Sequence, residues 1–246
     1  MPEGDWEVMP TPVGPSLTER AKSARAAFIE DNRRLAKAYE RLLQADRAYL
    51  WPDFGSTEDL QNELVDATHT YHRALYGNIG NFINFFRLAA PTDLTVIDGV
   101  AMPTRSARKW LAWIGERSDS FAAAVGPIEL SRRFRAEYID HPQGQNRSYS
   151  WNTIGAEHPR WGWMTAIYYF SHPTGEYPVF APDYEQLDPF APGWTPFIGH
   201  EAFMLAPDYH VVQYAWETLI TALLVTIRRH ALFSSLPPST EDMGQT

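Results

Sequence analysis

Two long stretches of helical periodicity near the start of the chain constrain its fold more than any other feature. In the first stretch, apolar residues recur at roughly helical spacing until Pro52, and charged residues occupy the other side. These apolar residues are Phe28, Leu35, Tyr39, Leu42 and Leu50. The preceding tetrapeptide SLTE, residues 16–19, has the form of a capping box, in which side chains satisfy free amides of the first helical turn. The pattern therefore predicts a helix over residues 17–50.

The second stretch opens at Ser56, a suitable N-cap with Asp59 three residues later. After this cap, one helical stripe is expected to face a core: Leu60, Leu64, Ala67, Tyr71, Leu75, Phe82 and Phe85. A second row lies on another side of the same helix: His72, Tyr76, Ile79, Ile83 and Phe86. Because its C-terminal half is apolar on two sides, this helix is expected either at the centre of the fold or in a subunit interface.

Two shorter helices are predicted next. After a loop that ends at Pro103, Thr104 caps a helix that extends to Gly126. Pro127 suits the first turn of the following helix, and Pro142 ends it. The apolar residues of the two helices are Trp110, Ile114, Phe121 and Val125, then Leu130, Phe134 and Tyr138.

Residues 142–207 differ in composition from the helical stretches, because Gly and Pro recur and aromatic residues crowd together. Met164–Phe170 and Tyr177–Phe180, separated by the turn sequence SHPTGE, predict a β-hairpin, and the rest is expected to be irregular. We interpret this region as an insertion before a last helix that begins near Asp208. That helix carries Val212, Ala215, Leu219, Leu223 and Ile227.

Together these patterns predict an all-α fold, a bundle of about five helices with an irregular, aromatic-rich insertion and at most one β-hairpin. Residues 1–15 contain four prolines and are expected to form a flexible N-terminal arm. Residues 16–233 form a single helical domain that includes the insertion at 142–207, and residues 234–246 are a flexible tail.

Composition excludes several classes of protein. In 246 residues, 44% hydrophobic side chains suffice for a real core, and the absence of cysteine excludes disulfides and thiolate metal sites. The N-terminus lacks the pattern of a secretion signal, and Leu219–Ile227 is about half the length of a membrane span. A net charge of -9 argues against extended DNA binding. We therefore expect a cytoplasmic protein without membrane contact.

The charge is unevenly spread along the chain. Residues 104–135 contain seven Lys or Arg and three Asp or Glu, so this segment carries 7 − 3 = +4. Between Arg160 and Arg228 there is no Lys or Arg at all. Such asymmetry is able to confine an anionic ligand to one side or to orient self-association, and it is also compatible with a merely solvated acidic surface.

A possible catalytic pair lies in the basic segment, in IELSRRFRAEYIDHP at residues 128–142. Arg135 stands six positions before His141, and Pro142 favours a helix break that would let the two side chains converge. Histidine is a good acid–base group and arginine a good phosphate clamp, so the pair suits RNA cleavage through the 2′-hydroxyl without a metal.

This motif and the order of helices resemble the HEPN superfamily of small helical domains, over residues 16–141 and 208–233. Many members are metal-independent ribonucleases of toxin and antiviral systems, with an arginine and a histidine separated by four to six residues. The resemblance implies that Arg135 and His141 are catalytic, that RNA is the partner, and that no cofactor is needed. It also implies a homodimer, because the family commonly assembles its site from two chains.

A non-catalytic role is the alternative. Ala136 stands where active members of that superfamily usually have a polar residue. Arg135 would then be a solvated helix residue and His141 a C-terminal cap. The protein would be a helical interaction module or dimerisation protein, with the two-sided second helix and the aromatic insertion as its interface.

A second alternative is metal binding by a helical bundle. Glu63, Asp66, His69 and His72 stand three apart, but such spacing rotates around a helix, so only His69 and His72 can share an ion. Another element would have to add a ligand, and the dipeptides at 157–158 and 200–201 each offer a His and a Glu. The competing interpretation is a solvent-facing polar strip.

Overall fold

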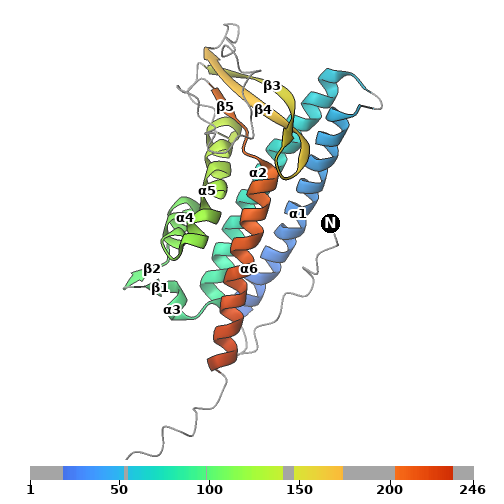
Figure 1. The fold of residues 1–246 in the computed structure, drawn as a ribbon. Coiled ribbons are helices and arrows are strands. Elements are labelled where there is room, and N and C mark those ends of the chain that lie inside the picture. Colours follow the sequence, from blue (N-terminus) through green and yellow to red (C-terminus); the bar gives the residue numbers. More distant parts are fainter. Residues whose placement is uncertain (1–18, 53–54, 98, 141–146, 174–202, 235–246) are drawn as a thin grey trace, which may run out of the picture.

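The computed structural model describes residues 19–52, 55–97, 99–140, 147–173 and 203–234. Over these residues the protein is mostly helical, and a small antiparallel sheet packs at one end (Figure 1). The expected N-terminal arm, residues 16–18 of the expected capping box, residues 142–146 and 174–202 of the insertion, and residues 235–246 of the expected tail lie outside the described residues.

The first two helices form a long antiparallel pair. Helix α1 spans Glu19–Leu50, close to the expected 17–50, and helix α2 spans Thr57–Ala89 and begins where expected. Ser56 is the N-cap of α2 as predicted, because its Oγ accepts the Asp59 amide at 3.1 Å. Aromatic rings join the two helices, with the Phe28 ring 5.1 Å from that of Phe82.

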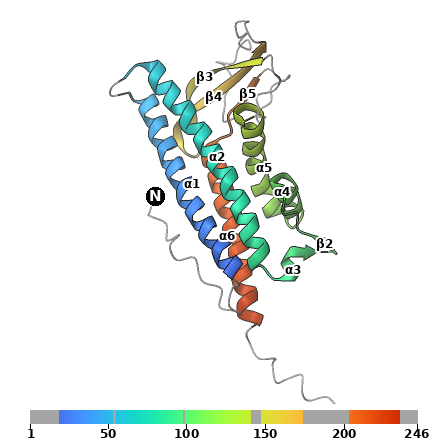
Figure 2. The same cartoon turned by 180° about the vertical axis from the view of Figure 1, so that it is seen from behind.

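Helix α2 lies at the centre of the molecule (Figure 2). The last helix, α6, spans Tyr209–Ser234 and runs beside it, where Trp216 Nε1 donates to Asn78 Oδ1 at 2.7 Å. Both rows of α2 predicted from the sequence are largely buried, including Tyr71 and Phe82 in one row and Ile79 in the other. Of the two alternatives for this helix, the structure shows the central position.

Helix α6 is also apolar enough over Tyr209–Arg229 to cross a membrane, by length and composition alone. The core helix of a soluble protein meets the same criterion, and Trp216, Leu219 and Ile220 are buried against the rest of the fold.

A short connection leads to the next pair of helices. It contains α3 (Thr92–Thr95) and a minimal hairpin of β1 (Val96–Ile97) with β2 (Val100–Ala101). Helix α4 then spans Ala107–Gly115 and α5 spans Asp119–Phe134.

The break between α4 and α5 corrects the prediction. The helices separate at residues 116–118 instead of at Gly126, and the cap of α4 is Ser106 instead of Thr104. Ser118 caps α5 by accepting the Phe121 amide at 3.2 Å. A buried stripe of Ala124, Ile128, Ser131 and Phe134 continues through Pro127. Burial of this stripe offsets the cost of an interior proline, which is about 3 kcal/mol.

The described part of the insertion is not irregular. Strand β3 (Arg147–His158) pairs antiparallel with β4 (Gly162–Pro173), and β5 (Phe203–Leu205) pairs with the other edge of β4. Met164–Phe170 is therefore in a hairpin as predicted, but its hairpin partner is β3. The expected partner strand at 177–180 lies outside the described residues. The all-α expectation is corrected accordingly, since the described residues are mostly helical but also form β-strands.

A tight turn explains the pairing of β3 with β4. His158 Nδ1 accepts the amides of Arg160 and Trp161 at 3.0 and 3.1 Å, and Gly162 has φ +80°, which favours glycine. The hairpin packs over the end of α1. Thr153 Oγ1 donates to the Tyr49 hydroxyl at 2.6 Å, and a Cβ at Gly155 would lie 2.9 Å from Leu50 Cδ2. A side chain at residue 155 would therefore require the Leu50 side chain to shift where strand and helix meet.

Candidate functional site

Arg135 begins a π-helical segment, η2 (Arg135–Asp140), which continues directly from the end of α5. Its guanidinium lies over the Tyr76 ring of α2, with Cζ 3.6 Å from the ring centroid, and its side chain is 15% exposed. The expectation of a solvated helix residue is therefore wrong. Stacking on an aromatic ring fixes the plane of the guanidinium.

Asp140, at the end of η2, lies between two arginines. Arg135 Nε is 3.1 Å from Asp140 Oδ2, and Arg73 Nε of α2 donates to Asp140 Oδ1 at 3.1 Å. Arg73 also reaches the Ile139 carbonyl oxygen, at the long distance of 3.5 Å. The sequence did not identify Arg73 as a site residue, because it stands 67 residues before Asp140 and no local spacing links the two.

These contacts leave an N–H donor of Arg135 without a hydrogen-bond acceptor. Its buried Nε has no hydrogen-bond partner in the described structure, although Asp140 Oδ2 is close, because the N–H does not point at that oxygen. The contact with Asp140 is thus electrostatic, and the guanidinium keeps hydrogen-bonding capacity for another acceptor.

The other half of the predicted pair, His141, lies outside the described residues and directly follows Asp140 in the chain. The regular α-helix has already ended at Phe134, so Arg135 and the residues after it do not follow α-helical spacing. Single π-helical turns are frequent at functional sites.

His69 and His72 lie beneath this segment and are not solvent-facing. His69 Nε2 is 2.9 Å from the Tyr169 hydroxyl, and His72 Nδ1 is 2.7 Å from Ser131 Oγ. Burial lowers the pKa of His69 to about 4 and that of His72 to about 3, so both imidazoles are neutral near pH 7. His72 Nε2 is buried with no hydrogen-bond partner in the described structure.

The metal-binding alternative gains no set of ligands from this arrangement. The two histidines contact separate partners, and Glu63 and Asp66 both bind Arg41, at 2.9 and 2.8 Å. Within the described ranges, no group of three His, Asp or Glu side chains is placed to hold an ion. His200 and Glu201 lie outside those ranges.

The histidines belong instead to an aromatic cluster that supports η2. The Phe134 ring lies 4.9 Å from His72, 5.1 Å from Tyr169 and 5.9 Å from Tyr138. Tyr169 comes from β4, so the sheet and α2 both pack against the end of α5. This cluster gives the segment that carries Arg135 a rigid base.

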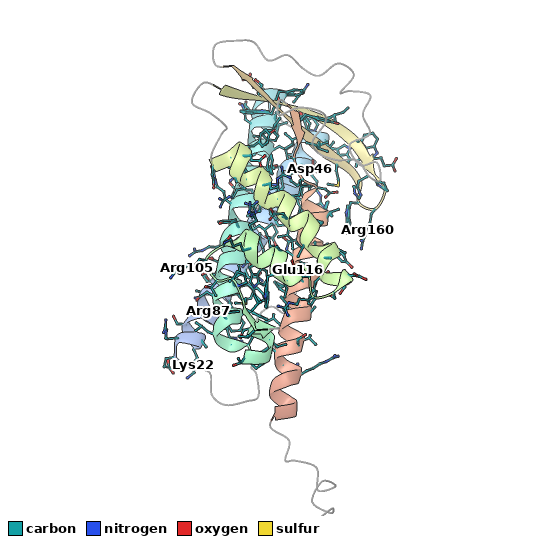
Figure 3. The ribbon with its side chains drawn as sticks, turned by 90° about the vertical axis from the view of Figure 1, so that its left-hand side faces the viewer. Lys22, Asp46, Arg87, Arg105, Glu116 and Arg160 are labelled. Atoms are coloured by element: carbon teal, nitrogen blue, oxygen red, sulfur yellow. The ribbon has the colours of Figure 1, made fainter. Side chains whose placement is uncertain are left out.

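A second polar cluster, which the sequence did not reveal, joins α1, α6 and the hairpin. Asp46 is buried where α1 passes below the strands (Figure 3). Its Oδ1 accepts the Thr165 amide at 2.9 Å, and its Oδ2 accepts the Tyr209 hydroxyl at 2.7 Å. Burial raises the pKa of the Asp46 carboxyl, and these hydrogen bonds partly oppose the rise. Nearby, the Tyr39 hydroxyl is 2.5 Å from His210 Nδ1.

The hairpin turn is tied to the start of α6 in the same region. Because His158 Nδ1 accepts two amides, its proton is on Nε2, which is 3.0 Å from Asp208 Oδ2. Asp208 Oδ1 accepts the amides of His210 and Val211, so Asp208 caps α6 as predicted. The Trp161 ring stacks on His210 at 5.0 Å. These contacts fasten secondary-structure elements to one another.

Comparison of the chain with protein-family models, curated proteins and solved structures gave no match. The geometry of the two clusters therefore has to indicate the function. In the second cluster, both carboxylate oxygens of Asp46 accept hydrogen bonds, and the Tyr39 hydroxyl lies against His210. At Arg135, a cation fixed on Tyr76 has a buried Nε–H without an acceptor and lies beside Asp140 and the exposed Arg73, which is an arrangement suited to an anionic ligand.

Proposed function

We propose that the protein binds RNA at Arg135 and cleaves it by metal-independent transesterification, as a HEPN-like ribonuclease. The observation that supports this proposal is the state of Arg135, which is fixed on Tyr76 while its Nε–H lacks a hydrogen-bond acceptor. A guanidinium held in one plane binds the oxygens of a phosphate with little loss of side-chain entropy.

The roles of the two residues follow from the chemistry. His141 accepts the proton of the 2′-hydroxyl, and O2′ forms a bond to phosphorus. Arg135 donates hydrogen bonds to the non-bridging oxygens, where negative charge accumulates. The bond from phosphorus to O5′ breaks and O5′ takes up a proton, which leaves a 2′,3′-cyclic phosphate and a 5′-hydroxyl. Water supplies this proton, and His141 releases to water the proton that it took from the 2′-hydroxyl.

The test compares three variants in the presence of EDTA on single-stranded RNA. His141→Ala and Arg135→Ala should each lower the cleavage rate at least about a hundredfold, the size of a typical acid–base or charge-stabilising contribution. Arg133→Ala is the matched control, because Arg133 lies two residues away and pairs with Glu137 at 3.5 Å. It should change the rate less than about threefold, since exposed ion pairs contribute little.

Melting temperatures of the variants separate a chemical role from a structural one. A variant that loses activity but melts at the wild-type temperature has lost a chemical contribution, whereas a lower melting temperature indicates a structural one. Arg135 is largely buried, so Arg135→Lys is measured beside Arg135→Ala to preserve the charge. If the wild-type protein leaves RNA intact, or if His141→Ala cleaves as fast as wild type, the ribonuclease proposal is wrong.

A non-catalytic interaction module is the second candidate, and exposed tryptophans favour it. Trp51 at the end of α1 is 60% exposed and Trp163 on β4 is 56% exposed. Trp51 follows Leu50 in the chain, and a Cβ built on Gly155 would lie within 4 Å of both Leu50 and Trp163. An apolar surface of this kind is typical of protein interfaces. The sides of α2 do not provide that interface, because residues of both rows are buried within the chain.

A further inference from the structure

We infer that Arg73 and Arg135 form a phosphate-binding clamp in which Asp140 is an internal competitor that the ligand displaces. Insofar as the ligand is RNA, this inference rests on the proposed function. The clamp itself requires only that a phosphate group takes the place of the Asp140 carboxylate between the two guanidinium groups.

The clamp carries two positive charges, on Arg73 and Arg135, whereas its competitor Asp140 carries one negative charge. Two guanidinium groups, one from α2 and one from η2, approach the two oxygens of a single carboxylate, each at 3.1 Å. The neighbouring carboxylates are engaged elsewhere, since Glu129 binds Arg132 at 2.6 Å and Glu137 binds Arg133 at 3.5 Å. One positive charge at the clamp therefore remains without a carboxylate among these neighbours.

The hydrogen bonds at the clamp are equally incomplete. Each guanidinium has five N–H donors in a planar fork. Arg73 directs one good hydrogen bond to Asp140, and the Nε–H of Arg135 directs none. A phosphate has more oxygens than a carboxylate and places them tetrahedrally, so it is able to accept bonds from both forks together. A phosphate thus matches this donor set better than Asp140 does.

The positions of the three side chains allow the exchange. Arg135 is fixed by Tyr76 and cannot follow Asp140 outward. Arg73 is exposed on the surface of α2, and Asp140 is the last residue of η2 with a side chain 26% exposed. One side of the clamp is thus rigid and the other open to solvent. Asp140 is able to rotate away without unfolding α5, because it lies beyond the regular helix.

The experiment removes the competitor without changing its shape. In Asp140→Asn, the amide keeps the size of the side chain and loses the negative charge. Glu137→Gln is the matched control, because it removes the same charge from the same segment and Glu137 is 28% exposed. Two probes are titrated by calorimetry: inorganic phosphate, and a 2′-O-methyl oligoribonucleotide that cannot be cleaved through a 2′-hydroxyl.

Asp140→Asn should tighten the binding of both probes by about fivefold or more, since a repelling carboxylate leaves the phosphate seat. Glu137→Gln should change either affinity less than about twofold. Arg73→Gln, with Asp140 intact, should weaken both probes by at least about fivefold. This second variant keeps the test decisive if Asp140→Asn lowers the melting temperature.

The outcomes separate the clamp from the ribonuclease proposal. Unchanged or weaker binding by a folded Asp140→Asn protein overturns the clamp, even if His141→Ala abolishes RNA cleavage. Tighter phosphate binding by Asp140→Asn supports the clamp, even if the wild-type protein leaves RNA intact. If Arg73→Gln binds both probes as well as wild type does, Arg73 does not belong to a clamp.

Discussion

Arg135 differs from its neighbours on α5 and η2 in what surrounds its guanidinium. Arg132 and Arg133 each pair with a glutamate three or four residues away along the helix, which is the common pattern of a helix surface. Arg135 instead contacts Tyr76 of another helix and a carboxylate at the end of its own segment. Tertiary packing, and not helical spacing, therefore decides which arginine of this basic segment is held in a fixed plane.

The buried histidines beneath η2 predict how stability depends on pH. The folded-state pKa values of His69 and His72, about 4 and 3, lie below the ordinary value of 6.5. The unfolded chain therefore binds more protons than the folded chain when the pH is below about 6.5, and stability falls as the pH is lowered from there. His72→Gln, which cannot titrate, should reduce this slope by about 1 kcal/mol per pH unit between pH 6 and 5.

Urea unfolding of wild type and His72→Gln at several pH values measures that slope. Comparing the two proteins cancels the contributions of other groups, including Asp46, whose raised pKa acts in the opposite direction. Above pH 7.5 the two curves should run parallel, because histidine is neutral in both states. Equal slopes between pH 6 and 5 would show that His72 is protonated in the folded protein.

At the scale of elements, the break between α4 and α5 shows how competing local signals were resolved. Ser118 followed by Asp119 is a strong helix start, and Gly115 lies close to Ala122 and Val125 where α4 and α5 meet. The Gly126-Pro127 pair had predicted a break later in the chain. It lies inside α5 because the buried stripe on both sides of Pro127 belongs to one helix.

Two substitutions test this boundary. Pro127→Ala should raise the free energy of unfolding by about 1–3 kcal/mol, because it restores an amide donor inside a helix. Ser118→Ala should lower it by about 1 kcal/mol, because it removes the N-cap oxygen. Both are measured by chemical denaturation. A helix that began at Pro127 would give the reverse pattern, with a loss at Pro127 and no effect at Ser118.

The sequence was informative where a signal is local and periodic. Ser56, Asp208 and the buried rows of α2 could be predicted because caps and helical stripes depend on residues three or four positions apart. The pairing of β3 with β4 was missed because the turn is closed by the His158 side chain, which is not a standard hairpin signal. Arg73 and Tyr76 could not be assigned to Arg135, because only the packing of α2 on α5 brings them together.

At the scale of the whole molecule, the distribution of charged residues favours binding of a polyanion along α4 and α5. The segment from residue 104 to 135, which contains α4 and α5, carries the excess of basic residues, and residues 161–227 contain no Lys or Arg. The latter range includes β4, β5 and most of α6. RNA that reaches Arg135 is thus expected to follow α5 and α4 and to avoid the exposed side of α6, since phosphate contacts need cations.

The last prediction concerns whether one site needs two chains. If Arg135 of one chain acts with His141 of the other, mixing Arg135→Ala protein with His141→Ala protein creates heterodimers with one intact site and one doubly altered site. Random exchange makes half of the dimers mixed, so the mixture should recover about a quarter of the wild-type cleavage rate. Each variant alone stays at least about a hundredfold below wild type. Gel filtration of the same samples shows whether dimers are present. If dimers form and exchange but the mixture stays as slow as its components, each chain holds a complete site of its own.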